Sequence, residues 1–327
     1  MSAPTAAGAE GLLVTPVDGI GRIETAIEAS VLAFPAGAED VIIATSRNWP
    51  DALGGSALAG VLDAPILLTE PGELPAAVAA EIDRLNATKA YILGGTGAVT
   101  VEVEAALDAL ENVSVERLAG DTRYDTACTV AQKAIDLQEG TYQGYAFVAT
   151  GADFPDALGA SPLAFAGRAP IYLADPALGD NAALVSTMLE AGVTRVIVLG
   201  GPDAVSPLVF DALSAGLPPR SVSRCAGENR YETAVQVAGL GASDWLGLTY
   251  DGVAIATGQN FPDALAGGVL QGRSGSVMLL TPTAYLDGWV SLELQHYAAQ
   301  INEVRFLGGT GAISPAVRTA VTDILQE

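Results

Sequence analysis

Three aspartates recur in one short motif and are the first candidates for chemistry. Asp51, Asp156 and Asp263 each follow a proline and precede an alanine-rich stretch. A carboxylate near a helix N-terminus can simply accept backbone N–H bonds there. The alternative is a contact to a sugar hydroxyl or a bridging cation at the carboxyl ends of parallel strands, where α/β proteins bind ligands. Because a carboxylate repels phosphate, these residues alone do not indicate a phosphate site.

Arginines recur in a second motif. Arg22, Arg123 and Arg230 each begin an Arg-x-x-Thr-Ala segment, and Arg117 and Arg224 stand just before the second and third copies. The chain has only 15 Lys+Arg, and the guanidinium fork fits phosphate and carboxylate groups. We therefore expect these arginines to contact an anionic ligand. The alternative is that they pair with neighbouring acids or brace the junctions between copies.

A pair of glycines follows an apolar stretch in each copy, and the pairs are Gly94 and Gly95, Gly200 and Gly201, and Gly308 and Gly309. Backbone amides in such a turn between a strand and a helix can hold an anion. The spacing fails the dinucleotide fingerprint, because the third glycine would fall at Thr100. In the second copy Pro202 and Asp203 remove an N–H group and add a negative charge. Two interpretations remain: turns that need a positive φ, or amides that touch an anion or a sugar.

The sequence offers little machinery for catalysis. His296 is the only histidine and lies outside the repeated motifs. No G-x-S-x-G, H-E-x-x-H or P-loop motif occurs. The repeated aspartates occur once per copy, whereas glycosidases use a pair of carboxyl groups. We therefore expect a binding protein with no catalytic residue, no metal site and no cofactor.

Composition narrows the partners. Asp+Glu number 38 and the net charge is −23, which disfavours nucleic acid and anionic membrane surfaces. No apolar run is long enough to insert into a membrane. Cys128 and Cys225 could form one disulfide or be two small buried residues. Residues 1–7 lack the basic and apolar regions of a signal peptide and look like the small-residue leader of a mature secreted protein.

The three motifs keep the same order along the chain, and the repeated aspartates lie 105 and 107 residues apart. This spacing predicts three tandem domains, which we place at residues 15–117, 118–224 and 225–327. In the first copy the patterning predicts helices over 22–32, 51–62, 74–85 and 100–110, and strands over 41–45, 65–69, 90–93 and 113–118. Helices that alternate with short buried strands predict a parallel sheet covered on both faces. Because the copies follow one another without linkers, we expect an α/β pseudo-trimer of Rossmann-like or flavodoxin-like domains.

The motifs resemble those of the cell-wall-binding repeat 2 (CWB2) family of bacterial surface proteins. That family's pattern runs R-L-A-G-x-x-R-Y-x-T-A, A-T-G-x-x-F-P-D-A-L, P-I-L-L-T and L-G-G-x-x-A-V-S. The second copy carries it over residues 117–127, 149–158 and 199–206, and the third is close to it. The first copy departs at residues 17–23, which lack R-L-A-G and the tyrosine. The resemblance extends from about residue 15 to residue 327.

The resemblance implies a secreted module at the bacterial cell surface that binds an anionic secondary cell-wall polymer without a covalent bond. Peptidoglycan is the alternative partner. It also implies that the region around the P-I-L-L stretch lines the polymer groove, although residues 66–68, 171–173 and 278–280 have the composition of buried strands. Three quasi-equivalent sites on one monomer would add avidity for a repetitive polymer. Two other functions stay open: a structural or adhesive scaffold without polymer affinity, and a glycan-active hydrolase.

Overall fold

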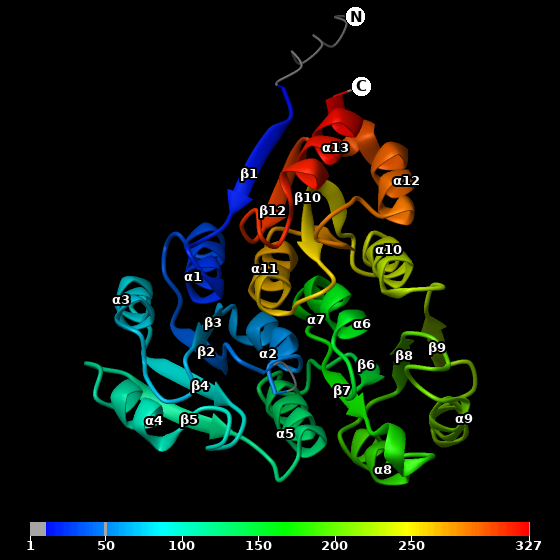
Figure 1. Cartoon of the computed structure of the whole chain (residues 1–327). Helices are drawn as coiled ribbons and strands as arrows, with labels where there is room; N and C mark the ends of the chain where they lie inside the picture. Colours follow the sequence, from blue (N-terminus) through cyan, green and yellow to red (C-terminus); the bar gives the residue numbers. More distant parts are fainter. Residues whose placement is uncertain (1–10, 49–50, 327) are drawn as a thin grey trace, which may run out of the picture.

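The computed structural model describes residues 11–48 and 51–326, and in it the chain forms three α/β units around a common centre (Figure 1). The predicted start of the chain and the motif residues Trp49 and Pro50 lie outside the described residues. Each unit has a four-stranded, all-parallel sheet with the same strand order. The predicted fold class, a pseudo-trimer of Rossmann-like units, is confirmed.

Unit 1 follows the predicted pattern closely. Its sheet has the order β3-β2-β4-β5, and its strands are β2 (Asp40–Thr45), β3 (Ile66–Thr69), β4 (Lys89–Leu93) and β5 (Ser114–Leu118). Its helices are α1 (Arg22–Ala33), α2 (Gly55–Leu62), α3 (Ala76–Leu85) and α4 (Val101–Asp108). All eight elements predicted for this copy are present.

Unit 2 repeats this arrangement with the order β7-β6-β8-β9. Its strands are β6 (Tyr145–Thr150), β7 (Ile171–Ala174), β8 (Arg195–Leu199) and β9 (Val222–Cys225). Its helices are α5 (Arg123–Asp136), α6 (Pro155–Gly159), α7 (Ser161–Gly167), η1 (Pro176–Leu178), α8 (Ala182–Glu190) and α9 (Pro207–Gly216).

Unit 3 is assembled from both ends of the chain. Its sheet has the order β1-β12-β10-β11, so β1 (Leu13–Val17) pairs with β12 (Glu303–Leu307), alongside β10 (Thr249–Thr257) and β11 (Ser276–Thr281). The helices are α10 (Arg230–Gly241), α11 (Pro262–Arg273), α12 (Gly288–Tyr297), η2 (Ala298–Gln300) and α13 (Pro315–Gln326). β1 thus fills the place that β5 and β9 fill in the other units, and the sequence analysis did not predict it.

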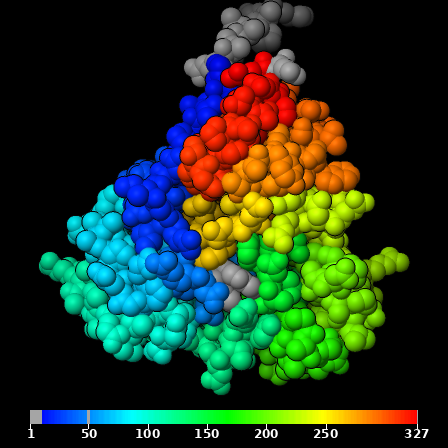
Figure 2. All heavy atoms as spheres, viewed as in Figure 1, coloured from blue at the N-terminus to red at the C-terminus, as the bar shows by residue number. Residues whose placement is uncertain are grey.

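Three central helices hold the units together. α2, α7 and α11 contact one another, and Figure 2 shows the three lobes meeting around this centre. The approach is close because small residues face it: a Cβ on Gly60 would lie 2.0 Å from the carbonyl oxygen of Phe165, and one on Gly268 would lie 2.4 Å from Cβ of Ser161. An ion pair between Arg273 and Asp63, at 2.8 Å, joins the C-terminal ends of α11 and α2.

The apolar strands are core, as expected. Side chains of β3, β7 and β11 are fully buried, so residues 66–68, 171–173 and 278–280 offer no surface to a ligand. Cys128 and Cys225 are free thiols rather than a disulfide. None of the helices in the described ranges has the length and apolarity to span a membrane.

Candidate functional site at the unit junctions

Each repeated aspartate lies where two units meet. Asp156 of unit 2 faces Arg230 and Thr233 from the first turn of α10 in unit 3. Asp51 faces Arg123 and Thr126 of unit 2. The same contact closes the ring, because Asp263 of unit 3 faces Arg22 and Thr25 of unit 1. Burial raises the pKa of all three carboxyl groups, and the facing threonine and arginine oppose that shift.

The arginines at the helix starts share one hydrogen bond that is the same in all three units. Nη1 of Arg22, Arg123 and Arg230 donates to the carbonyl oxygens of Ser46, Gly151 and Gly258, at 2.6, 2.9 and 2.9 Å. These acceptors all follow the Ala-Thr that ends the first strand of the repeat. The side chains are therefore held at the carboxyl ends of the strands. Arg230 also forms an ion pair with Asp153 across the junction, at 3.1 Å.

The other two predicted arginines are used inside their own units. Arg117 donates to the carbonyl oxygen of Gly94 at 2.8 Å and pairs with Glu104 at 2.8 Å. Arg224 donates to three carbonyl oxygens, those of Gly200, Gly201 and Val205. Both arginines brace a turn within one unit, which was not predicted; Arg117 also forms the kind of pair with an acid that was the alternative to ligand binding.

The glycine pairs divide into two roles. The first glycine of each pair, Gly94, Gly200 or Gly308, has φ between +90° and +98°. A Cβ at these positions would lie within 2.4 Å of Oδ2 of the repeated aspartate. The second glycines face open space, since nothing lies within 4 Å of a Cβ built on Gly95, Gly201 or Gly309. The second glycine therefore lies on the open side of the turn, although the carbonyl oxygen of Gly201 accepts from Arg224.

Two junctions contain equivalent pockets. The unit 3–unit 1 pocket has a volume of about 360 Å³, and among its lining residues are Arg22, Asp263, Asn260, Gly309 and Gly311. The unit 2–unit 3 pocket has a volume of about 550 Å³, and the corresponding lining residues are Arg230, Asp156, Asp153, Gly201 and Asp203. Among the described residues, the repeat thus builds an equivalent concave site at these two junctions, from an aspartate loop, a glycine turn and the first turn of the next unit's helix.

The two pockets differ in charge. Of the charged residues that the structure describes, Arg22 and Asp263 line the unit 3–unit 1 pocket. The unit 2–unit 3 pocket has one arginine, Arg230, and four acids: Asp153, Asp156, Asp203 and Glu228. An anion would therefore meet a much more favourable potential in the unit 3–unit 1 pocket.

The facing threonines were missed by the sequence analysis. Thr25, Thr126 and Thr233 accept N–H bonds from Gly19, Gly120 and Gly227, at 3.1–3.2 Å. Each therefore ties the start of its helix to the strand before it while it faces the aspartate of the preceding unit. Their recurrence in all three copies was the available signal.

The pattern of repeats and pockets agrees with a known family. The family described as cell wall binding domain 2 (CWB2) matches residues 17–104, 117–210 and 224–318. The chain belongs to this family. It is accordingly a cell-wall-binding protein built from three CWB2 repeats.

Two curated relatives come from Bacillus subtilis (strain 168). The chain is 28% identical over 268 residues to N-acetylmuramoyl-L-alanine amidase LytC, a match that covers 82% of this chain and 50% of the relative. It is 28% identical over 305 residues to the amidase enhancer, covering 93% of this chain and 39% of the relative. The chain therefore corresponds to half or less of each relative.

Solved structures of two Clostridium difficile proteins share the fold. Cwp6 superposes with a TM-score of 0.83 at 24% identity, covering all of this chain and 51% of Cwp6. Cwp8 also gives 0.83, at 26% identity, covering 97% of this chain and 52% of Cwp8.

Two positions of the CWB2 motif, a tyrosine and a glycine, differ in unit 1, and side-chain packing explains why they fit together. In units 2 and 3 the ring of Tyr124 or Tyr231 covers Gly151 or Gly258, and a Cβ on those glycines would lie 2.2 or 2.7 Å from the ring. In unit 1 Ile23 replaces the tyrosine. Ser46 stands at the place of the glycine, because the ring that would exclude its side chain is missing. The two differences of the first copy are therefore sterically compatible with each other.

Proposed function

We propose that this CWB2 protein anchors to the cell wall by binding an anionic secondary polymer in its junction pockets. The observation that supports this most directly is the unit 3–unit 1 pocket. There the Arg22 guanidinium and the open Gly309 turn face one cavity that contains a single carboxylate. Guanidinium and backbone N–H groups are the usual ligands of phosphate and carboxylate groups.

The sites are unequal in this proposal. The acids that line the unit 2–unit 3 pocket repel an anionic polymer, so the unit 3–unit 1 pocket supplies most of the affinity. The predicted roles of Arg123 and Asp51 at the remaining junction follow by repeat equivalence. Binding at more than one pocket would add avidity along a repetitive chain.

We also propose that the chain itself is not catalytic, acts as a monomer and is secreted. The repeated carboxylates are single in each unit and are engaged by the neighbouring unit. In the described part of the chain, no group of three or more His, Cys, Asp or Glu side chains could hold a metal ion.

The test is co-sedimentation of the purified chain with bacterial sacculi, before and after chemical removal of the anionic secondary polymer. We expect wild-type binding to be lost on removal. Arg22→Ala should weaken binding about tenfold, the scale of one charged hydrogen bond, and Arg230→Ala should weaken it less. Arg168→Ala is the control, because this exposed arginine lines neither pocket.

Three results would change the proposal. Binding that survives removal of the polymer would identify peptidoglycan as the ligand. Full binding by Arg22→Ala at unchanged stability would exclude the unit 3–unit 1 pocket. No binding to either wall preparation would favour the scaffold function, with the arginines acting only as braces.

A further inference from the structure

The three sheets present one equivalent patch each, and the patches are filled differently. Each patch has three residues. Two are the first and third residues of the strand beside the edge strand, which is β4, β8 or β12. The last lies opposite the second of these, on the edge strand β5, β9 or β1. Because the edge strands pair in the same register, these positions are Lys89, Tyr91 and Glu116 in unit 1; Arg195, Ile197 and Ser223 in unit 2; and Glu303, Arg305 and Thr15 in unit 3.

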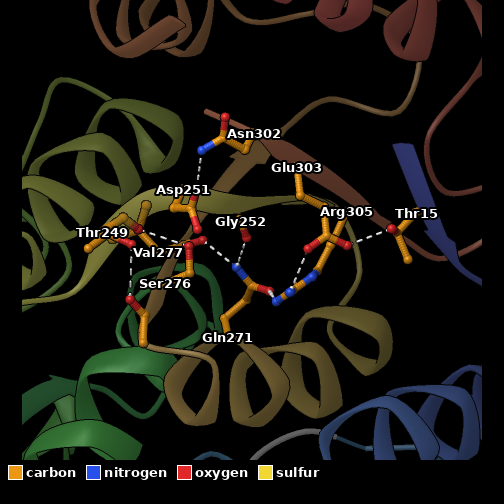
Figure 3. A network of polar contacts seen from close by, with 11 residues as sticks. Thr15, Thr249, Asp251, Gly252, Gln271, Ser276, Val277, Asn302, Glu303 and Arg305 are labelled. Atoms are coloured by element: carbon orange, nitrogen blue, oxygen red, sulfur yellow. Dashed lines mark hydrogen bonds and ion pairs between the residues drawn. The ribbon is translucent and has the colours of Figure 1, made fainter. Parts of the chain in front are cut away.

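Two of the patches are closed by internal ion pairs. In unit 1, Glu116 binds both Lys89 at 2.6 Å and Lys133 at 2.8 Å, above the ring of Tyr91. In unit 3, Arg305 pairs with Glu303 at 2.7 Å and donates to Gln271 at 2.9 Å, while Thr15 donates to Glu303 (Figure 3). Each basic residue is thereby neutralised by a carboxylate of its own patch.

The unit 2 patch lacks this carboxylate and is open. Ser223 replaces the glutamate that lies opposite Tyr91 in unit 1, and Leu240 of α10 stands where Lys133 stands in α5. A groove of about 620 Å³ occupies this place, between the ends of β6, β8 and β9 and the C-terminal end of α10. A second hollow of about 390 Å³ continues it along α10 and shares Ile197, Ser223 and Leu240 with it.

The groove has a specific chemical character. Within the described ranges its lining includes Arg195 and Arg220 but no Asp or Glu, in a chain with 38 acids. Neither arginine is in a salt bridge among the described residues; Arg195 lies over the ring of Tyr145 and donates to its hydroxyl. Tyr145 also packs against Trp245, with ring centroids 4.8 Å apart.

We propose that this groove is a second binding site, present only in unit 2, for an acidic sugar. The Trp245 ring, which packs against Tyr145, offers an apolar surface for the C–H face of a pyranose. Arg195 and Arg220 supply guanidinium groups for its carboxylate or phosphate. Concave sites with apolar walls and a few placed polar groups are typical of small-ligand sites. The inference does not rest on the junction pockets.

The test uses a glucuronate-containing tetrasaccharide as the probe and the indole N–H resonance of Trp245 as the reporter. The resonance is assigned with Trp245→Phe. We expect a saturable shift with the acidic probe and none with chitotetraose, its neutral counterpart. Arg195→Ala should weaken binding about tenfold or more, the scale of a charged hydrogen bond.

Two further variants make the test sharp. Ser223→Glu rebuilds the carboxylate of the unit 1 patch beside Arg195 while both groove arginines and both aromatic rings stay in place, and it should abolish the shift. Lys89→Ala removes the equivalent cation in unit 1 and should leave it unchanged. The proposal is overturned if the tetrasaccharide leaves Trp245 unshifted at millimolar concentration, if Ser223→Glu binds normally, or if chitotetraose binds equally well. A shift produced by a polyglutamate peptide but not by the tetrasaccharide would also overturn it. Loss of sacculus binding by Arg22→Ala would leave these outcomes unaffected.

Discussion

Asp263 lies directly against Gly308: a Cβ on this glycine would lie 2.3 Å from Oδ2 of the aspartate. The aspartate loop and the glycine turn of one repeat are therefore a single packed unit. This contact explains why the two motifs occur together in every copy, and it separates the structural glycine from the one that faces the pocket.

We expect Gly308→Ala to destabilise the protein by roughly 1–3 kcal/mol, because a side chain at positive φ is strained and the new methyl group meets Asp263. The measurement is the free energy of unfolding in urea. Gly309→Ala is the matched control, since its Cβ meets nothing within 4 Å. An equal decrease in the free energy of unfolding of the two variants would show that Gly308 and Gly309 do not have different structural roles.

Removing acids from the unit 2–unit 3 pocket should strengthen binding to an anionic polymer. Asp153→Asn, Asp203→Gly and Glu228→Ile together give it the residues of the unit 3–unit 1 pocket. We expect sacculus binding to tighten by about tenfold as repulsion is removed, with a weaker dependence on salt. Weaker binding by the triple variant, restored by neither pH nor salt, would indicate that these acids hold a bridging cation instead.

Stability should depend on pH through the repeated aspartates. Burial raises the pKa of Asp156 and Asp263 above the ordinary value of 3.8. The folded state then holds these protons to a higher pH than the unfolded chain. The contribution of these groups to stability therefore increases as pH falls from neutral through the folded pKa and is lost again as pH rises. The double variant Asp156→Asn/Asp263→Asn should flatten this part of the profile in urea titrations between pH 7 and pH 4; an unchanged slope would contradict the assignment.

Arg318 of α13 braces the glycine turn of unit 3 from a different position. Its Nη2 donates to the carbonyl oxygen of Gly308 at 2.6 Å, as Arg117 does for Gly94 in unit 1. In unit 3 the strand residue equivalent to Arg117 is Pro16 of β1. In unit 1 the helix residue equivalent to Arg318 is Glu104 of α4.

Arg318→Ala should cost about 1–3 kcal/mol because it leaves a half-buried carbonyl without its donor. The double change Pro16→Arg/Arg318→Glu copies the Arg117–Glu104 pair and should recover part of that loss. Thermal melts of the three proteins provide the comparison. A double variant less stable than Arg318→Ala would show that the two arrangements are not interchangeable.

The two cysteines should react slowly. Burial raises the pKa of the Cys128 and Cys225 thiols to about 11, which leaves little of the reactive thiolate at pH 8. Alkylation by iodoacetamide should be on the order of 100-fold slower in the folded protein than in urea. Comparable rates would show that the thiols are accessible and unperturbed.

The helices and strands of this fold were predictable because the same motifs and patterning occur in three copies. Strands such as residues 41–45 and 66–69 are short, apolar and bounded by turn residues, so their type and their parallel pairing follow from the pattern. The threefold arrangement followed from the missing linkers. β1 was not predicted, because Leu13–Val17 lacks the Arg-x-Ala-Gly that marks the end of the equivalent strand in the other two units.

The site was only partly predictable. Sequence repetition singled out the aspartates and arginines, but not which partner each would meet, because the contacts run from one unit to the next. Nothing local to Arg117 distinguishes it from Arg123, yet one braces a turn and the other stands at a junction. The unit 2 groove depends on single-residue differences between the repeats, such as Ser223 opposite Ile197. A search for residues that the repeats share does not find them.

The pairing of β1 with β12 also fixes an order of events during synthesis. Leu13 pairs with Glu303 and Val17 with Leu307, so β1 is synthesised before units 1 and 2 but has no neighbour until most of unit 3 has followed them. Units 1 and 2 have all their strands within one stretch of sequence and can form their sheets while translation continues. Unit 3 cannot, because the ends of a long loop must come together, at a cost in chain entropy, before β1 and β12 form stabilising contacts. The completed ring is therefore a late product of folding, and a chain interrupted before β12 would leave β1 and one edge of β10 unpaired, as places for aggregation.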